Sequence, residues 1–498
     1  MKTMANYTRK ALFSVGIITA FTILAGIMGY IVRAIFARKL PLEDFGLFYS
    51  VLAFVGMFGI FKSLGMDRAL IYYIPKLRSA KQESKIKSAL RHVFSMLLAT
   101  NAAFLVLIAL FSGLLQSHYF RHPSASAVLI ILAVHSVFDS FVNILKFYAQ
   151  GSQRMAVFSS VDFTRMSIAA ASSVFAFNLG YGVKGAAAAY LVSQLATFLI
   201  YFFILLGKER LRSIEKDREL SKNLRFYGLQ IMLIYVGGLV LSYSDKIMLT
   251  LLRNLTEVGI YSAVFPTAML LWYIPMTLTS VQLPLISEFW SKGMTEHMKE
   301  GLRLLYKFLI ALMLPLSLAL FIYSDFVLRI LYGSEFAAGS LAFKVLVIGV
   351  MFNSLHMVNS TVFAGIGKPK VNTWILAIGA AANVALNIPF IIMYGYLGAS
   401  ITTAATYILM SLVGTIALYR GKIAELPYAN WAKTGFAAAL FFGVMVYLNK
   451  VLVMESVPKI AVILASSGVV YLAALFMLKV ISTEEIMDIL KRLKKSKQ

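Results

Sequence analysis

The chain has 498 residues, of which 60% are hydrophobic and only 14% are charged. Water-soluble domains carry about 25% charged residues, so the composition excludes that class and indicates a polytopic membrane protein. A net charge of +25 would favour nucleic acid as partner of a soluble protein, but basic cytoplasmic loops explain it here, and no nucleic-acid partner is expected. Cysteine is absent, which excludes disulfides and thiolate metal sites.

Fourteen stretches are predicted to be transmembrane helices, since about 20 apolar residues cross a bilayer. They cover residues 11–32, 45–70, 93–115, 127–149, 166–180, 185–206, 227–252, 260–286, 308–325, 340–363, 371–393, 398–419, 434–452 and 460–479. With the N-terminus inside, cytoplasmic segments contain 33 lysines and arginines and outer segments 9. This asymmetry predicts that both termini are cytoplasmic and that the protein lies in the cytoplasmic (inner or plasma) membrane.

Two motifs each occur twice in the chain, and the offset between the copies is nearly the same for both. Arg-Lys-Leu-Pro-Leu-Glu-Asp-Phe-Gly-Leu-Phe-Tyr-Ser at 38–50 is echoed by Arg-Asn-Leu-Thr-Glu-Val-Gly-Ile-Tyr-Ser at 253–262, offset by 215 residues at the arginine and 212 at the tyrosine. Tyr-Gly-Val-Lys-Gly-Ala at 181–186 recurs as Tyr-Gly-Tyr-Leu-Gly-Ala at 394–399, offset by 213. The shared offset predicts two parallel repeats about an axis along the membrane normal.

The repeat predicts the domain organisation of an all-α protein with two six-helix lobes and an appended C-terminal hairpin. The predicted parts are the N-terminal lobe 1–206, a cytoplasmic linker 207–226, the C-terminal lobe 227–419, helices 13 and 14 within 420–479, and a basic tail 480–498. The tail is expected to form a short amphipathic helix at the membrane surface.

Polar side chains follow one face of the fourth predicted helix. His135, Asp139, Asn143 and Lys146 stand at i, i+4, i+8 and i+11, a spacing that aligns them on a helix. They either line a wet cavity or hold the bundle together, for example by pairing Asp139 with a lysine.

The matching helix of the second repeat carries a similar polar set. Asn353, His356 and Asn359 lie on one side of it. They are candidates for cavity-lining groups, and the alternative is hydrogen bonding between helices.

Cations outnumber acids within the predicted spans. The repeat places Lys246, which follows Asp245, at the position equivalent to Arg33, and Lys62 lies deep in the second span. Arg33 either faces a central cleft or snorkels to the outer interface, and Asp67 and Arg68 are expected to form an interfacial pair. A positively biased cavity favours an anionic substrate such as a phosphate or diphosphate.

Motifs typical of enzymes are absent from the sequence. It contains no His-Glu-x-x-His, no Gly-x-x-x-x-Gly-Lys and no Gly-x-Ser-x-Gly, and no acidic cluster for a metal. We therefore expect neither catalysis nor a bound cofactor.

Several segments resemble one transporter family. They are Tyr-Ser-Asp-Lys-Ile-Met-Leu at 243–249, Val-Gly-Ile-Tyr-Ser-Ala at 258–263, Leu-Pro-Leu-Ile-Ser at 283–287, the stretches 40–46 and 65–75, and the two Tyr-Gly-x-x-Gly-Ala turns. Together with the helix count, they resemble the Wzx-type polysaccharide flippases of the multidrug/oligosaccharidyl-lipid/polysaccharide exporter superfamily. The likeness extends over essentially the whole chain.

The resemblance implies a MATE-like secondary transporter with alternating access. Its substrate would be a polyisoprenyl diphosphate carrying an oligosaccharide, flipped from the cytoplasmic to the outer leaflet for cell-surface polysaccharide biosynthesis. Arg33, Lys62, Lys146 and Lys246 would hold the diphosphate. The polar face of the fourth predicted helix makes His135 and Asp139 the candidate sites for coupling transport to a proton or sodium gradient. Expected partners are this lipid-linked oligosaccharide, membrane lipids and glycan-assembly proteins, around a monomeric transport unit.

Two other functions stay open at this point. A drug or cation exporter of the same fold would need an acidic cavity, which the excess of cations disfavours. A glycan polymerase or ligase in the membrane would need a long outer loop, and the predicted outer loops have about 5 to 16 residues.

Overall fold

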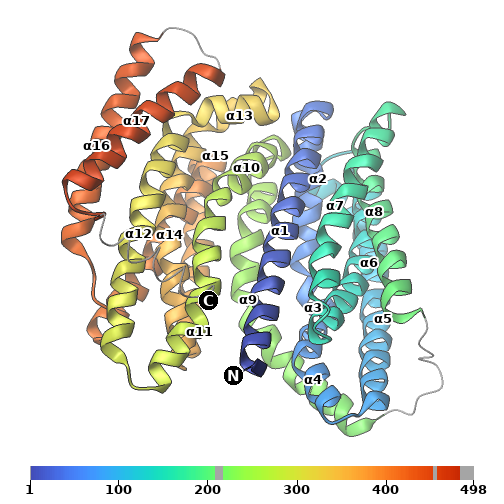
Figure 1. Cartoon of the computed structure of the whole chain (residues 1–498). Coiled ribbons are helices and arrows are strands. Elements are labelled where there is room, and N and C mark those ends of the chain that lie inside the picture. Colours follow the sequence, from blue (N-terminus) through green and yellow to red (C-terminus); the bar gives the residue numbers. More distant parts are fainter. Residues whose placement is uncertain (1, 208–216, 453–456, 483–498) are drawn as a thin grey trace. The chain divides into compact units, whose positions relative to one another are not determined.

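The computed structural model describes residues 2–207, 217–452 and 457–482, with the side chains of 2–15 and 234 left out. Every described element is a helix (Figure 1). In chain order they are α1 (Lys2–Lys39), α2 (Leu42–Met57), α3 (Gly59–Ser63), α4 (Met66–Ser79), α5 (Glu83–Leu114), η1 (Leu115–Phe120), α6 (Ala125–Gly151), α7 (Met155–Asn178), α8 (Gly182–Leu206), α9 (Arg218–Leu252), α10 (Leu255–Ala268), η2 (Met269–Trp272), α11 (Tyr273–Ser291), α12 (Thr295–Ile322), α13 (Ser324–Tyr332), η3 (Ser334–Gly339), α14 (Ser340–Gly365), α15 (Pro369–Arg420), α16 (Tyr428–Val451) and α17 (Val457–Met477).

Each of the fourteen predicted spans coincides with a helix or a run of helices. By length and apolar composition, eleven helices of the described residues can cross a membrane, and twelve when the two bent portions of α9 count as one span. The difference from fourteen has two sources: α7 does not meet this criterion, and α15 contains two predicted spans that meet at Gly395, where the backbone leaves the helical conformation. The all-helical membrane fold is confirmed, whereas the count of fourteen and the orientation stay predictions.

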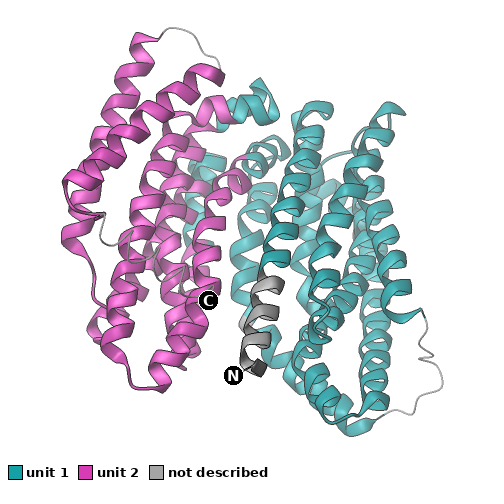
Figure 2. Ribbon diagram, viewed as in Figure 1, with its two compact units in different colours: residues 1–263, 328–339, 384–399 teal, residues 264–327, 340–383, 400–498 magenta. Residues whose placement is uncertain are grey.

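The helices fall into two compact units (Figure 2). Unit 1 comprises residues 1–263, 328–339 and 384–399, and unit 2 comprises 264–327, 340–383 and 400–498. The predicted lobes and their boundaries remain a prediction. Much of the predicted linker and the amphipathic part of the tail lie outside the described residues.

The second predicted span is broken inside unit 1. It consists of α2, α3 and α4, with Leu64 and Gly65 in the left-handed conformation between α3 and α4. A Cβ on Gly65 would lie 2.3 Å from the carbonyl oxygen of Gly228 in α9, so glycine is required both for its φ of +69° and for this close approach. The break places Lys62 and Asp67 on either side of a turn within the bundle.

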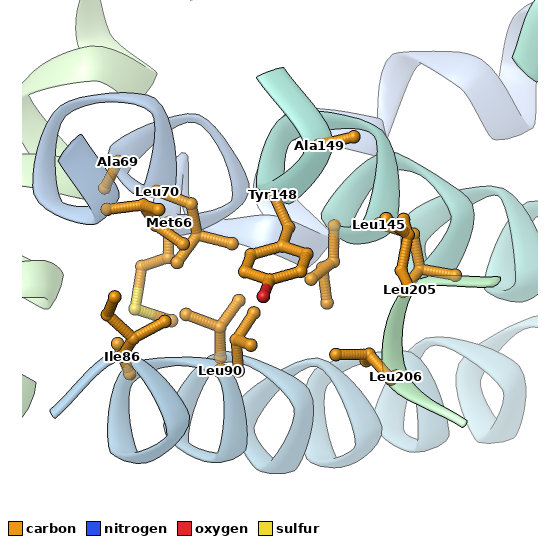
Figure 3. Close-up of a cluster of buried hydrophobic side chains, with 14 of the residues drawn as sticks. Met66, Ala69, Leu70, Ile86, Leu90, Leu145, Tyr148, Ala149, Leu205 and Leu206 are labelled. Carbon is orange, nitrogen blue, oxygen red and sulfur yellow. The ribbon is translucent and has the colours of Figure 1, made fainter. Parts of the chain in front are cut away.

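An aliphatic cluster fixes α4 beyond the break (Figure 3). Met66 and Leu70 pack with Leu90 of α5, Tyr148 of α6 and Leu205 of α8. Helix association within a bundle depends on such close packing, because lipid tails are as apolar as the side chains. The cluster thereby holds the start of α4, which carries Asp67 and Arg68, against α6.

In unit 2, α16 and α17 pack on each other and on α12. Phe441 of α16 and Leu475 of α17 share one buried cluster with Ala311 of α12. The hydroxyl of Tyr471 donates to the carbonyl of Ala311 at 2.7 Å, which satisfies a buried polar group within this apolar contact.

Candidate functional site

Unit 1 encloses a cavity of about 680 Å³, lined by side chains from α1, α2, α3, α4, α6, α7, α8 and α9. Its charged lining residues are four cations and two acids: Arg33, Lys62, Arg68, Arg165, Asp67 and Asp139. The predicted residues His135 and Asn143 also line it. The cavity therefore has the positive bias that the sequence predicted, although two of its four cations were not among the candidates.

Arg33 extends from α1 toward two aromatic rings. Its Nε donates to the hydroxyl of Tyr49 at 3.3 Å, and its guanidinium carbon lies 5.1 Å from the Tyr49 ring centroid and 5.7 Å from that of Tyr30. Aromatic faces attract cations and orient the planar guanidinium. Because Tyr49 accepts only the Nε–H of Arg33, the terminal N–H groups of the guanidinium can donate to a ligand in the cavity.

Lys62 is held at the end of α3, just before the helix break. Its Nζ donates to the carbonyl of Ser136 at 3.0 Å and lies 4.9 Å from the Phe104 ring centroid, with the residue only 4% exposed. The hydroxyl of Thr100 donates to the Lys62 carbonyl at 2.6 Å, which satisfies a backbone group near the break. An ammonium has three donors, so Lys62 can bind an anion while keeping Ser136.

Arg68 and Asp67, which the sequence predicted to form an interfacial pair, both line the cavity. The guanidinium carbon of Arg68 lies 4.0 Å from the Tyr235 ring centroid and 5.3 Å from that of Phe147. Aromatic contacts on α6 and α9 thus stabilise a cation that sequence reasoning assigned to the membrane surface.

A row of alternating charges connects α6 and α7. Lys146 pairs with Asp162, Arg165 lies 3.2 Å from both Asp162 and Asp139, and Asn143 donates to Asp139 at 3.0 Å. Lys146 is therefore engaged by Asp162 and does not line the cavity.

Asp162 and Arg165 were missed because the preceding loop was predicted to extend to residue 165. In the structure α7 begins at Met155, so both residues belong to the helix. Pairing with α6 offsets the cost of the two charges, which hydropathy alone does not register. The signal available in the sequence was the i, i+3 spacing of an acid and an arginine.

His135 lies in the cavity wall with its ring 5.7 Å from that of Tyr190. The residue is 7% exposed, and its Nδ1 has no hydrogen-bond partner among the described residues. A buried imidazole nitrogen with spare capacity is suited to exchange a proton or to meet a ligand.

Asp245 and Lys246 do not line this cavity. The carboxyl of Asp245 accepts from the Tyr261 hydroxyl and, at 2.8 Å, from Asn387 Nδ2, all within unit 1. This carboxyl is therefore held by neutral donors of α10 and α15.

The three polar candidates of α14 belong to unit 2. Asn353, His356 and Asn359 are all buried. The Asn359 amide lies 2.6 Å from the Tyr306 hydroxyl of α12 and 2.8 Å from the Thr415 hydroxyl of α15. For Asn359, these contacts favour the alternative of hydrogen bonding between helices.

Nothing in the described residues forms a metal centre, since no group of three or more His, Asp or Glu side chains is placed to hold an ion.

Known proteins share this fold and this sequence pattern. The sequence matches the family described as polysaccharide biosynthesis protein over residues 12–290 and the MatE family over residues 231–390. An uncharacterized membrane protein of Methanocaldococcus jannaschii is 29% identical over 98% of this chain and 99% of its own length. A Shigella flexneri protein named for O-antigen transport is 24% identical over 76% of this chain and 90% of its own.

Among solved structures, the lipid II flippase MurJ in an inward closed conformation matches with a TM-score of 0.72. The match covers 92% of this chain and 97% of MurJ at 16% identity, which shows a common fold. Because the family match spans more than half of the chain, this multi-pass membrane protein belongs to the polysaccharide biosynthesis protein family.

Proposed function

We propose that the protein flips a polyisoprenyl-diphosphate-linked oligosaccharide from the cytoplasmic to the outer leaflet of the cell membrane. The observation that carries this proposal is the cavity of unit 1, where four cations face two acids among transmembrane helices. The family, and the name of the Shigella relative, point to polysaccharide export as the context.

A diphosphate fits this cavity chemically. Its oxygens accept charge-assisted hydrogen bonds, and guanidinium groups bind them in pairs. Arg33 and Lys62 are the predicted ligands that line the cavity, and Arg68 and Arg165 join them. Lys146 acts through Asp162, which it pairs with, and Lys246 stays a candidate by its repeat equivalence to Arg33.

Sugar hydroxyls would meet the polar lining, and the isoprenyl chain would remain in lipid. In this proposal the protein acts by binding and conformational change, without covalent chemistry. A proton or sodium gradient supplies the energy, with His135 and Asp139 as coupling groups, and the transport unit is one chain that works beside glycan-assembly proteins.

A cation or drug exporter is the second candidate, favoured by the match of residues 231–390 to the MatE family. The charge of the cavity favours the flippase, because a cationic drug would be repelled by the excess of cations.

The test is flipping of a fluorescent lipid-linked oligosaccharide in proteoliposomes, with and without an imposed proton or sodium gradient. We expect gradient-dependent loss of the lipid from the cytoplasmic-side leaflet, and an at least tenfold slower rate in Lys62→Gln. Arg420→Gln, which removes an exposed cation at the end of α15, is the matched control and should flip at the parent rate. Efflux of a cationic dye without lipid flipping would contradict the proposal.

A further inference from the structure

Arg165 lies between two carboxylates, and their negative charges oppose the binding of an anionic substrate to it. Its Nη1 is 3.2 Å from Asp139 Oδ1, and its Nη2 is 3.2 Å from Asp162 Oδ1. Carboxylate and phosphate oxygens compete for the same planar donors of a guanidinium. The two aspartates therefore occupy Arg165 in the way a diphosphate would.

The two carboxylates differ in what they would keep if Arg165 turned away. Asp162 retains its ion pair with Lys146. Among the described residues, Asp139 would keep hydrogen bonds from neutral donors only, from Asn143 at 3.0 Å and Gln194 at 3.2 Å. A carboxylate beside a bound anion and without its cation binds a proton more readily. If Arg165 moved away, Asp139 would therefore lose its ion pair, whereas Asp162 would keep one.

We propose that Asp139 holds Arg165 as an internal competitor of the substrate diphosphate, and that a proton on Asp139 releases Arg165 to bind it. This inference rests on the proposed function and adds how the proton and the substrate are linked. The proton enters from water in the cavity and leaves when Arg165 returns. Because linkage is reciprocal, diphosphate and proton bind with positive cooperativity.

Other charged and titratable groups surround Asp139 and must be separated from it. They are Arg33 on α1, Tyr49 on α2, Lys62 on α3, Asp67 and Arg68 on α4, His135 and Lys146 on α6, Asp162 on α7, Tyr190 on α8 and Tyr243 on α9. From α5, the neutral Asn101 contacts this part of α6, where its Oδ1 accepts from Ser140. The test below therefore removes the carboxyl of Asp67 and the imidazole of His135 in separate variants.

The test is binding of inorganic pyrophosphate to the purified full-length protein, measured by calorimetry from pH 5.5 to 8. Asp139→Asn should bind about tenfold more tightly than the parent at pH 8, within the usual range of coupling between sites. The gain should shrink toward pH 5.5, because in this proposal a proton on the parent Asp139 has the same effect as the substitution. Using the ratio of the two affinities at each pH cancels the titration of pyrophosphate itself.

Asp67→Asn is the matched control, because it removes the same charge from the same cavity. Asp67 makes no ion pair with Arg165 among the described residues. In an Arg165→Gln background the gain from Asp139→Asn should vanish, whereas any gain from Asp67→Asn should persist. If Arg165→Gln does not fold, Arg165→Lys serves, since an ammonium cannot bridge two carboxylates with a planar fork. His135→Asn should leave the pH-dependent gain in place.

Equal gains from Asp139→Asn with and without Arg165, or a gain that is constant with pH, would overturn the inference while leaving the flippase proposal intact. A parent protein that binds no pyrophosphate and flips no lipid would overturn both.

Discussion

The two copies of the repeated motif place a tyrosine at the same position with opposite partners. In the first copy Tyr49 accepts a hydrogen bond from Arg33, a cation that lines the cavity. In the second copy Tyr261 donates to Asp245, a 3% exposed carboxyl that Asn387 also holds. The equivalent tyrosines thus have different roles. Tyr49 orients a cation that lines the cavity, whereas Tyr261 belongs to a hydrogen-bond network around a buried carboxyl.

What the two copies share is the packing of their backbones. A Cβ on Gly46 of α2 would lie 1.8 Å from the carbonyl oxygen of Leu255, and a Cβ on Gly259 of α10 would lie 2.6 Å from that of Leu42. Each glycine therefore admits the start of the other copy's helix, a reciprocal contact that a two-fold related pair produces. Small residues allow helices to approach this closely in membranes.

The largest expected effect comes from breaking this shared contact. Gly46→Val would place a Cβ 1.8 Å from the Leu255 carbonyl oxygen and add two methyl groups, and we expect at least about 3 kcal/mol of destabilisation. Thermal unfolding in detergent measures it. Gly113→Ala in α5, where a Cβ meets nothing within 4 Å, is the control and should change stability little.

Removing the tyrosine hydroxyl should reduce the unfolding free energy by different amounts in the two copies. Tyr261→Phe withdraws a donor from the buried Asp245 carboxyl and is expected to cost about 2 kcal/mol of unfolding free energy. Tyr49→Phe removes a partly buried hydrogen bond of 3.3 Å and should cost about 1 kcal/mol or less. Equal losses in thermal unfolding would show that the two environments do not differ as described.

The cations at equivalent positions should differ in transport. Arg33→Gln removes a ligand from the cavity, so we expect an at least tenfold lower flipping rate, about 1.4 kcal/mol in the transport barrier. Lys246→Gln should reduce the rate less, because Lys246 does not line the cavity. A larger loss from Lys246→Gln would reverse the comparison and make the second half the main binding half.

The smallest expected effect lies at the N-terminus of α9. Asp217 caps α9 by accepting from the Leu220 N–H at 2.9 Å. Asp217→Ala should cost about 1 kcal/mol, and Asp217→Asn nearly nothing, in thermal unfolding at pH 7.

This cap also predicts a pH dependence. The Leu220 N–H, with Lys85 Nζ 3.5 Å away, lowers the pKa of Asp217 below its usual value. The contribution of the ionised cap is thus complete above the unfolded-state pKa of about 4 and is lost as the pH falls through the lower folded-state pKa. Equal responses of the parent and Asp217→Asn to acid would contradict this cause.

The sequence by itself determined the membrane class, the helical segments, the repeated motifs and the sign of the cavity's charge. These follow from local properties, since a run of apolar residues enters lipid whatever its neighbours are. Of the candidate residues that it named, Arg33, Lys62, His135, Asp139 and Asn143 line one cavity in the structure.

Only the tertiary structure decided how the charges are paired. In the structure Lys146 pairs with Asp162, and Arg165 contacts two carboxylates. Arg68 lies near two aromatic rings in the cavity wall. The structure also showed that the second span breaks at Leu64 and Gly65. Hydropathy records the cost of placing a charge in lipid. Whether a partner on another helix offsets that cost depends on which helix faces meet, and this is fixed only when the bundle packs.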